Sequence, residues 1–285
     1  MSVLVVDTAF GSWVGVVGGD PVGEADSRTH VESLSRDISR ALSEAGLVPS
    51  RIDRIVVGLG PAPYTGLRVG IVTAKALGFA LGASVIGIDD LTPQARLTVA
   101  LREGDPAYAS LTRRERARAE AASGARHLTL AVNDARRRQL YAALLEDDGT
   151  PVPLPRVGGG GLDGKDAGRG SASMDIDYPD ALVRRVNAAI TGPSASPCVV
   201  DVAGRGAARY DAVWDALAAS GLVTDGILLD GGPRGLELFA SVAERRQPHG
   251  PRPVEPLYLR RPDVSVPPPL KQVLGSGPAT KAAQP

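Results

Sequence analysis

The sequence of 285 residues contains few of the residue types that build disulfides and metal sites. It has one cysteine, Cys198, and three histidines, His30, His127 and His249. A single cysteine excludes an intrachain disulfide and is typical of a reducing compartment. No two histidines lie within one helical turn of each other, so the sequence has no HxxxH or HExxH zinc pair. We therefore expect a cytoplasmic protein without a metal centre of its own.

The sequence also lacks an excess of charge and a long apolar run. Its 32 lysines and arginines balance its 32 aspartates and glutamates, so no overall field attracts the protein to nucleic acid or to a membrane. The first residues, M-S-V-L-V-V-D, have no charged region before a short apolar run, which predicts a strand rather than a signal peptide. The longest apolar stretch is interrupted by Arg68 and Lys75 and is shorter than the ~20 residues that a membrane span needs.

The most distinctive segment of the sequence is Gly60–Gly82, which is rich in small residues. It begins as a turn with two prolines and continues as a predicted helix in which Gly66, Gly70, Ala74 and Gly78 recur every four residues. This spacing places them on one helix face. Each interior glycine costs about 1 kcal/mol relative to alanine, so another element must pack closely against this face. That element is either part of the same chain or a helix of a partner.

The first third of the chain predicts an alternation of strands and helices. Periodic apolar residues indicate an amphipathic helix over Val31–Gly46. Short apolar runs separated by turn residues indicate strands. The expected strands are Val3–Asp7, Trp13–Val17, Val22–Ser27, Ile52–Leu59 and Ser84–Ile88. The order is β-β-β-α-β-α-β.

The remainder repeats this pattern after a segment, Leu91–Arg126, that is mostly helical in composition and contains a charge run at Arg113–Arg118. We interpret that run as the solvated face of a helix. The expected strands are Leu128–Asp134, Gln139–Leu145, Pro151–Val157, Cys198–Val202 and Gly226–Asp230, and the expected helices are Asp180–Ile190, Ala208–Ala219 and Gly235–Arg246.

The recurrence of strand, aspartate, turn and strand half a chain apart indicates a duplicated unit. Two such units suggest an α/β fold of the actin-like ATPase (ASKHA) type, with two lobes, each a mixed sheet of about five strands flanked by helices. We predict a first lobe over residues 1–97, completed by residues 235–261, and a second lobe over residues 98–234 with a mobile loop at 158–173. Residues 262–285 predict a disordered tail.

In this architecture the two aspartate-ended turns can face a cleft and hold phosphate. The residues that would do so are Asp7 and Thr8 in the first turn and Asp134 and Arg136 in the second. Phosphate-binding turns need small residues, so that backbone N–H groups reach the phosphate oxygens. Here Phe10 is bulky and the glycine comes late, at Gly11. We expect these turns to be vestigial and predict no catalytic residue. The sequence also has no G-x-S-x-G nucleophile elbow.

Five short motifs resemble the bacterial TsaB (YeaZ) family. The segment G-P-A-P-Y-T-G-L-R-V-G at Gly60–Gly70, followed by A-K-A-L, is similar to the family's G-P-G-S-[FY]-T-G-[LI]-R-[IV]-G…A-K-[GA]-L signature and departs from it at Ala62 and Pro63. Supporting matches are V-V-D-T at Val5–Thr8, H-V-E at His30–Glu32, D-A-R with Tyr141 at the second turn, and P-L-Y-L-R at Pro256–Arg260. The matches run in order from Met1 to Arg261.

The resemblance implies a role in making threonylcarbamoyladenosine beside the anticodon of tRNA. It implies a non-catalytic subunit that pairs with TsaD, the transferase, and with the ATPase TsaE, or with a second copy of itself. ATP, ADP and the metal are then expected in the partner subunits, and tRNA contact only through the complex. By resemblance, the interface lies on the two helices of the first lobe. The expected interface residues are Leu34, Ile38, Leu42, Gly66, Arg68, Gly70, Ala74, Lys75 and Gly78.

Three alternatives stay open. An autonomous ATP-dependent phosphotransferase of the same fold would use Asp7 and Asp134 to hold Mg-nucleotide. A peptidase would need a metal or nucleophile site that the sequence does not offer. Direct tRNA binding would depend on Arg113–Arg118 and Arg136–Arg138 and would weaken steeply with salt.

Overall fold

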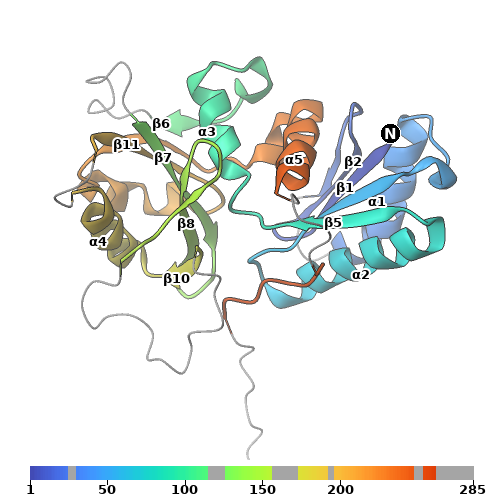
Figure 1. Ribbon diagram of the computed structural model, residues 1–285, viewed down its shortest axis with the longest axis horizontal. Coiled ribbons are helices and arrows are strands. Elements are labelled where there is room, and N and C mark those ends of the chain that lie inside the picture. The colour runs from blue at the N-terminus through green and yellow to red at the C-terminus, as the bar shows by residue number, and fades with distance from the viewer. Residues whose placement is uncertain (25–29, 115–125, 156–172, 192–195, 247–252, 261–285) are drawn as a thin grey trace, which may run out of the picture.

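A computed structural model describes the chain except for residues 25–29, 115–125, 156–172, 192–195, 247–252 and 261–285. Two sheets with their helices lie side by side (Figure 1). The expected loop at 158–173, apart from Ser173, and the expected tail at 262–285 lie outside the described residues. Within the described residues no helix has both the length and the apolar character to cross a membrane.

The first sheet has five strands in the order β3-β2-β1-β4-β5. Their bounds are β1 (Val3–Asp7), β2 (Ser12–Val16), β3 (Val22–Glu24), β4 (Arg54–Gly58) and β5 (Ser84–Ile88). The pairs β1–β2 and β2–β3 are antiparallel, whereas β1–β4 and β4–β5 are parallel. The sheet is therefore mixed, as expected, and its parallel strands bring their carboxyl ends to one edge.

Both faces of the first sheet are covered, because successive strand residues point to opposite sides. Leu4 and Val6 pack beneath α1 (His30–Glu44) and α2 (Tyr64–Leu81). Val3 and Val5 pack on the other side against α5 (Pro233–Arg245). The helix α5, from late in the sequence, thus covers the sheet that the first residues of the chain begin.

The second sheet repeats the same arrangement. Its strands run in the order β10-β8-β7-β11-β12-β6, with β9 paired to β8. Their bounds are β6 (Arg113–Arg114), β7 (Arg126–Asp134), β8 (Leu140–Glu146), β9 (Pro151–Val152), β10 (Asp175–Asp177), β11 (Cys198–Ala203) and β12 (Ser220–Thr224). One face packs on α4 (Pro179–Ile190) and Trp214, and α3 (Gln94–Arg102) contacts β7 and β11. The order β10-β8-β7-β11-β12 mirrors the first sheet and bears out the duplication.

Three predicted elements of the second half are wrong. Among the described residues of Leu91–Arg126, which exclude 115–125, only α3 is an α-helix. A 3-10 turn begins at Pro106, where Asp105 accepts the backbone N–H of Ala107. The charge run begins in a strand, since β6 pairs with β12, and its residues 115–118 lie outside the described residues. Here tertiary strand pairing outweighs helix propensity.

The other two corrections adjoin each other in the chain. Instead of an α-helix over Ala208–Ala219, a 3-10 segment runs over Ala208–Ala216 and is interrupted at Tyr210. The strand that follows is β12, not Gly226–Asp230, and Leu228–Gly231 is a 3-10 turn. A Cβ on Gly221 would lie 2.2 Å from Asp201 Oδ1, so glycine allows β12 to approach β11 closely.

Candidate functional site

The first aspartate-ended turn joins β1 to β2 and is tied to α2. Asp7 is buried, and its Oδ1 accepts the backbone N–H of Ala9 at 2.9 Å. The Thr8 hydroxyl, also buried, donates to the carbonyl oxygen of Gly66 at 2.9 Å. That hydroxyl, which the sequence suggested for a phosphate, is thus committed to the first turn of α2.

Phe10 fills the space between the two lobes at this turn. Its ring packs against the apolar cluster under α1 and α2 and against a second cluster that contains Ala135 and Tyr141 of the other lobe. A side chain of this size beside Asp7 leaves less room for a nucleotide than the glycine or serine of a phosphate-binding turn.

A small cavity between the lobes has polar groups from both of them. It is lined by Asp7, Phe10, Asp90, Gln94, Asn133, Ile227, Leu228, Leu229 and Phe239. A Cβ on Gly58 would lie 2.6 Å from Asp90 Oδ1 and 2.7 Å from Asp7 Oδ1, so the two carboxylates converge over this glycine. The ends of the parallel strands β1, β4 and β5 supply the aspartates and the glycine, whereas Asn133 comes from β7.

Burial shifts the acidity of both aspartates. It raises the pKa of Asp7 to about 6. It raises the pKa of Asp90 well above the ordinary value, and the charges of Asp7 and Asp89 raise it further. Neither oxygen of Asp90, nor Oδ1 of Asn133, has a hydrogen-bond partner among the described residues. Burial therefore disfavours the charged form of both side chains, and the ionised form of either one repels an anionic phosphate.

Sequence reasoning found Asp7 but missed Asp90 and Asn133. The signal for Asp90 was present, because Asp89 and Asp90 directly follow the predicted strand Ser84–Ile88. Parallel neighbours of that strand end at the same edge of a sheet. No group of three or more histidine, cysteine or acidic side chains that could hold a metal exists within the described residues.

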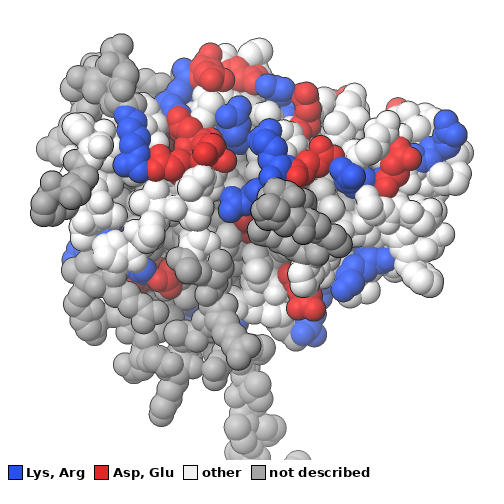
Figure 2. All heavy atoms as spheres, in the orientation of Figure 1, with Lys and Arg blue, Asp and Glu red and all other residues white. Residues whose placement is uncertain are grey.

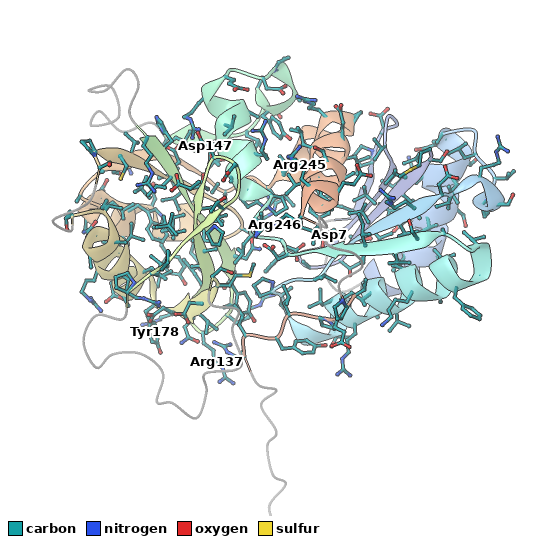
Figure 3. The ribbon with its side chains drawn as sticks, in the orientation of Figure 1. Asp7, Arg137, Asp147, Tyr178, Arg245 and Arg246 are labelled. Atoms are coloured by element: carbon teal, nitrogen blue, oxygen red, sulfur yellow. The ribbon has the colours of Figure 1, made fainter. Side chains whose placement is uncertain are left out.

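The second aspartate-ended turn joins β7 to β8, and its Asp134 and Arg136 do not line the cavity. Asp134 Oδ1 accepts the backbone N–H of Arg136 at 2.8 Å, and its Oδ2 lies 3.1 Å from the guanidinium of Arg209. Figure 3 shows Arg137 at the lower end of the second sheet, away from Asp7 between the lobes. Of the four residues expected to hold phosphate, Asp7 lines the cavity with Asp90, whereas Thr8, Asp134 and Arg136 do not.

The expected interface residues of α1 lie inside the protein. Leu34, Ile38 and Leu42 are between 1% and 5% exposed and pack in the core of the first lobe. Side chains buried in the chain's own core cannot contact a partner without unfolding. This corrects the expectation for these three positions.

The small-residue face of α2 also packs within the chain. A Cβ on Gly70 would lie 2.2 Å from Thr8 Oγ1, and a Cβ on Gly78 would lie 2.3 Å from Val85 of β5. Ala74 is fully buried, and the carbonyl of Gly66 is bonded to Thr8. Of the two alternatives for this face, the structure has the intrachain helix–sheet contact, which corrects the expectation that these small residues meet a partner.

Arg68 and Lys75 are exposed, and they contact the last described segment of the chain. Arg68 Nε donates to the Tyr258 hydroxyl at 2.8 Å and its guanidinium lies 5.7 Å from the centre of that ring. Lys75 Nζ donates to the carbonyl of Val254 at 3.3 Å. The backbone N–H of Leu257 donates to the carbonyl of Leu59. The closing segment, residues 253–260, is thus held on α2 and on the end of β4.

The outer face of α2 is apolar and exposed. Val72 is 64% exposed and Phe79 is 93% exposed, and Ala76 lies between them on the same face. Figure 2 shows the surface at the lower right, over α2, as white with a few separate charged side chains, whereas acidic and basic side chains lie close together over the top of the molecule. Adjoining exposed apolar side chains on one helix face are typical of a surface that another molecule covers.

Comparison with known proteins finds likeness in sequence over most of the chain. The family model of TsaD, tRNA N6-adenosine threonylcarbamoyltransferase, matches residues 21–111. An uncharacterized protein of Mycobacterium tuberculosis strain H37Rv is 30% identical over 249 residues, 87% of this chain and 83% of that protein. A tRNA N6-adenosine threonylcarbamoyltransferase of Methylobacterium nodulans is 43% identical over 86 residues, 30% of this chain and 24% of that protein.

The architecture matches a solved structure over nearly its whole length. The chain is similar to YeaZ from Pseudomonas aeruginosa with a TM-score of 0.56 and 22% identity, covering 90% of this chain and 99% of that one. This likeness identifies the fold as the actin-like, ASKHA-type fold that the duplicated sheets already indicate.

Proposed function

Because this chain belongs to the TsaB (YeaZ) family, we propose that it is a non-catalytic subunit that pairs with TsaD for threonylcarbamoyl transfer to tRNA. A role in threonylcarbamoyladenosine biosynthesis is supported by the TsaD family match and by the YeaZ-like architecture. Under this proposal TsaE joins the complex, and ATP, ADP and the metal bind in the partner subunits.

The observation that carries the proposal is the outer face of α2. Val72, Ala76 and Phe79 present an apolar strip to solvent, and Arg68 and Lys75 border it. An apolar strip with a charged border has the composition of a protein interface. The partner is therefore expected on the outer side of α2, opposite the glycines that pack on the sheet, and a second copy of this chain would use the same side.

The geometry of the cleft supports a scaffold more than a phosphotransferase. The Thr8 hydroxyl is bonded within the chain, Phe10 occupies the turn, and the carboxylates of Asp7 and Asp90 repel phosphate. In the proposed mechanism the chain binds the active conformation of TsaD and thereby raises its population.

The test is co-purification with TsaD and TsaE from the same organism, followed by a tRNA threonylcarbamoylation assay with and without this chain. We expect a stable complex whose activity requires the chain. Phe79→Asp places a charge in the apolar strip and should abolish the complex, while the circular dichroism and melting temperature of the isolated chain stay unchanged.

Tyr178→Asp is the matched control, because it places the same charge on an exposed aromatic residue of the second lobe. It should leave the complex intact. If Phe79→Asp co-purifies with TsaD as well as the wild type does, the outer face of α2 is not the interface. If the wild-type chain forms no complex and does not affect the modification, the proposed function is wrong.

A further inference from the structure

The small cavity between the lobes contains hydrogen-bond acceptors that no described residue satisfies. Asp90, which follows β5 of the first sheet, is 4% exposed, and Asn133, in β7 of the second sheet, is 1% exposed. Both side chains line the cavity. Neither oxygen of Asp90, nor Oδ1 of Asn133, has a hydrogen-bond partner among the described residues. Buried polar atoms normally have a partner, so three unpaired oxygens around one cavity indicate that it binds a donor or a cation.

Asp7 brings a second carboxylate to the same place, between the lobes (Figure 3). Asp7 Oδ1 and Asp90 Oδ1 lie 2.7 Å and 2.6 Å from one point, the position that a Cβ on Gly58 would occupy. The two oxygens are therefore close enough for one metal ion to contact both, because Ca²⁺ binds oxygens at about 2.3–2.6 Å. A residue with a Cβ at position 58 would fill the space between the carboxylates, and glycine leaves it open.

The described residues that line the cavity include no lysine or arginine to neutralise these carboxylates. The charge of Arg205 favours the ionised form of Asp7, although burial outweighs it. The guanidinium of Arg205 is itself paired with Asp230 at 2.7 Å. Asp89, the next acid in the chain, uses its Oδ1 to accept the backbone N–H of Thr92 at 2.6 Å. The negative charge in the cavity is therefore without a matching positive charge among its described lining residues.

The kind of ion follows from the set of donors. The described lining residues include no histidine, cysteine or methionine, so the available ligands are oxygens. Oxygen ligands suit Mg²⁺ and Ca²⁺, and both ions are commonly held by carboxylates together with water, with amide or carbonyl oxygens added for Ca²⁺. A divalent ion neutralises two carboxylates, which a monovalent ion does not. Because the third donor is an amide, this set is distinct from the clusters of three acidic, histidine or cysteine side chains considered above.

We propose that Asp7, Asp90 and Asn133 bind one divalent metal ion, Mg²⁺ or Ca²⁺, which joins the two lobes, with water completing its coordination. This differs from the expectation that the chain has no metal centre of its own. The ion is structural and needs no nucleotide, because Phe10 fills the turn beside it and the Thr8 hydroxyl is bonded within the chain. The inference does not depend on the proposed function.

The test titrates the full chain with Mn²⁺ in metal-free buffer without nucleotide and follows the electron paramagnetic resonance signal of the free ion. We expect one bound Mn²⁺ per chain, which Mg²⁺ or Ca²⁺ displaces. Asp90→Asn should weaken binding at least about tenfold, the loss that even a change outside the ligand set typically causes. Asn133→Leu should weaken it by a smaller factor, because it removes a neutral ligand. Asp180→Asn is the control, since it removes the same charge from an exposed position of α4.

Melting temperatures separate metal binding from folding. Mg²⁺ or Ca²⁺ should raise the melting temperature of the wild type and of Asp180→Asn but not that of Asp90→Asn, whereas in EDTA Asp90→Asn should be the most stable of the three. The inference is overturned if the wild type binds no Mn²⁺ at millimolar concentration, or if Asp90→Asn binds it as tightly as the wild type does. Binding that occurs only with ATP present would also overturn it, because the metal would then belong to a nucleotide site.

Discussion

Asp7 and Asp90 are buried acids whose protonation couples pH to stability. An acid with a raised pKa in the folded state binds its proton more tightly when folded, so its stabilising contribution is complete below its unfolded pKa and is lost as the pH rises through the folded value. For Asp7 the window extends from about 4 to about 6, and the shift from 3.8 to about 6 corresponds to about 3 kcal/mol. The pKa of Asp90 is raised in the same direction.

We predict that Asp90→Asn stabilises the protein at pH 7.5 and not at pH 4. The amide keeps the shape of the side chain and removes the charge that burial and Asp7 disfavour. Urea unfolding of the variant and of the wild type in EDTA at the two pH values measures the difference in their free energies of unfolding. If the two proteins are equally stable at pH 7.5, the negative charge of Asp90 does not destabilise the folded state, and the prediction is wrong.

Some residues of the candidate site could be predicted from the sequence and others could not. Asp7 could be predicted, because it ends a strand within a repeated pattern. The partnership of Asp7 with Asp90 could not, since it depends on the strand order that places β4, with Gly58, between β1 and β5. The sequence also did not determine that Gly70 and Gly78 pack within the chain. Their spacing of four residues places small residues on one helix face but does not show which element packs against that face.

At the scale of elements, α2 is a helix with two different faces. The inner face has glycines where the backbone approaches β1 and β5, and the outer face carries Val72 and Phe79. We predict that Gly70→Ala destabilises the chain by about 1–3 kcal/mol, because the added methyl group meets the buried Thr8. The better helix propensity of alanine, about 1 kcal/mol, offsets only part of this.

Thermal or urea unfolding of the isolated chain measures this cost. Gly19→Ala is the control, since its nearest neighbour would lie at 3.5 Å, and it should change stability by about 0.5 kcal/mol or less. A Gly70→Ala chain as stable as the wild type would show that the contact between α2 and the β1–β2 turn is loose.

Elements with strong periodicity and clear ends could be predicted closely. The helices α1, α4 and α5 and the strand β5 lie at or within two residues of their predicted bounds, and α2 lies within the segment predicted to contain it. The errors fall where local composition and tertiary contacts disagree. Arginine-rich β6 is a strand only because β12 lies beside it, and the segment Ala208–Ala216 has helical composition but tightens into 3-10 turns.

For the molecule as a whole, the closing segment joins the two lobes. Leu257 and Tyr258 pack with the apolar cluster of the first lobe, whereas Leu259 packs with Ala135 and Tyr141 of the second. Arg260 then donates to the carbonyl of Ala135 in the turn between β7 and β8. Residues 253–260 therefore contribute to the stability of both lobes and to their relative placement.

We predict that a chain ending after residue 252 is less stable than a chain ending after residue 261 by about 3–5 kcal/mol, because one buried and several half-buried apolar side chains are lost. Calorimetry of the two chains measures the difference. A single unfolding transition that splits into two in the shorter chain would show that the segment couples the lobes. Identical transitions in the two chains would contradict this role.

Because α5 packs on the first sheet but comes late in the sequence, the order of synthesis leaves one face of that sheet uncovered for a time. The chain completes β5 at residue 88 but does not supply the helix that covers the other face of that sheet until residues 233–245. At about 5–20 residues per second, the ribosome needs roughly 10–30 s to make the intervening segment. During that interval Val3, Val5 and Val56 lack the cover that Leu236, Phe239 and Val242 later provide. The nascent first lobe is therefore the stage at which chaperone binding or aggregation should be greatest.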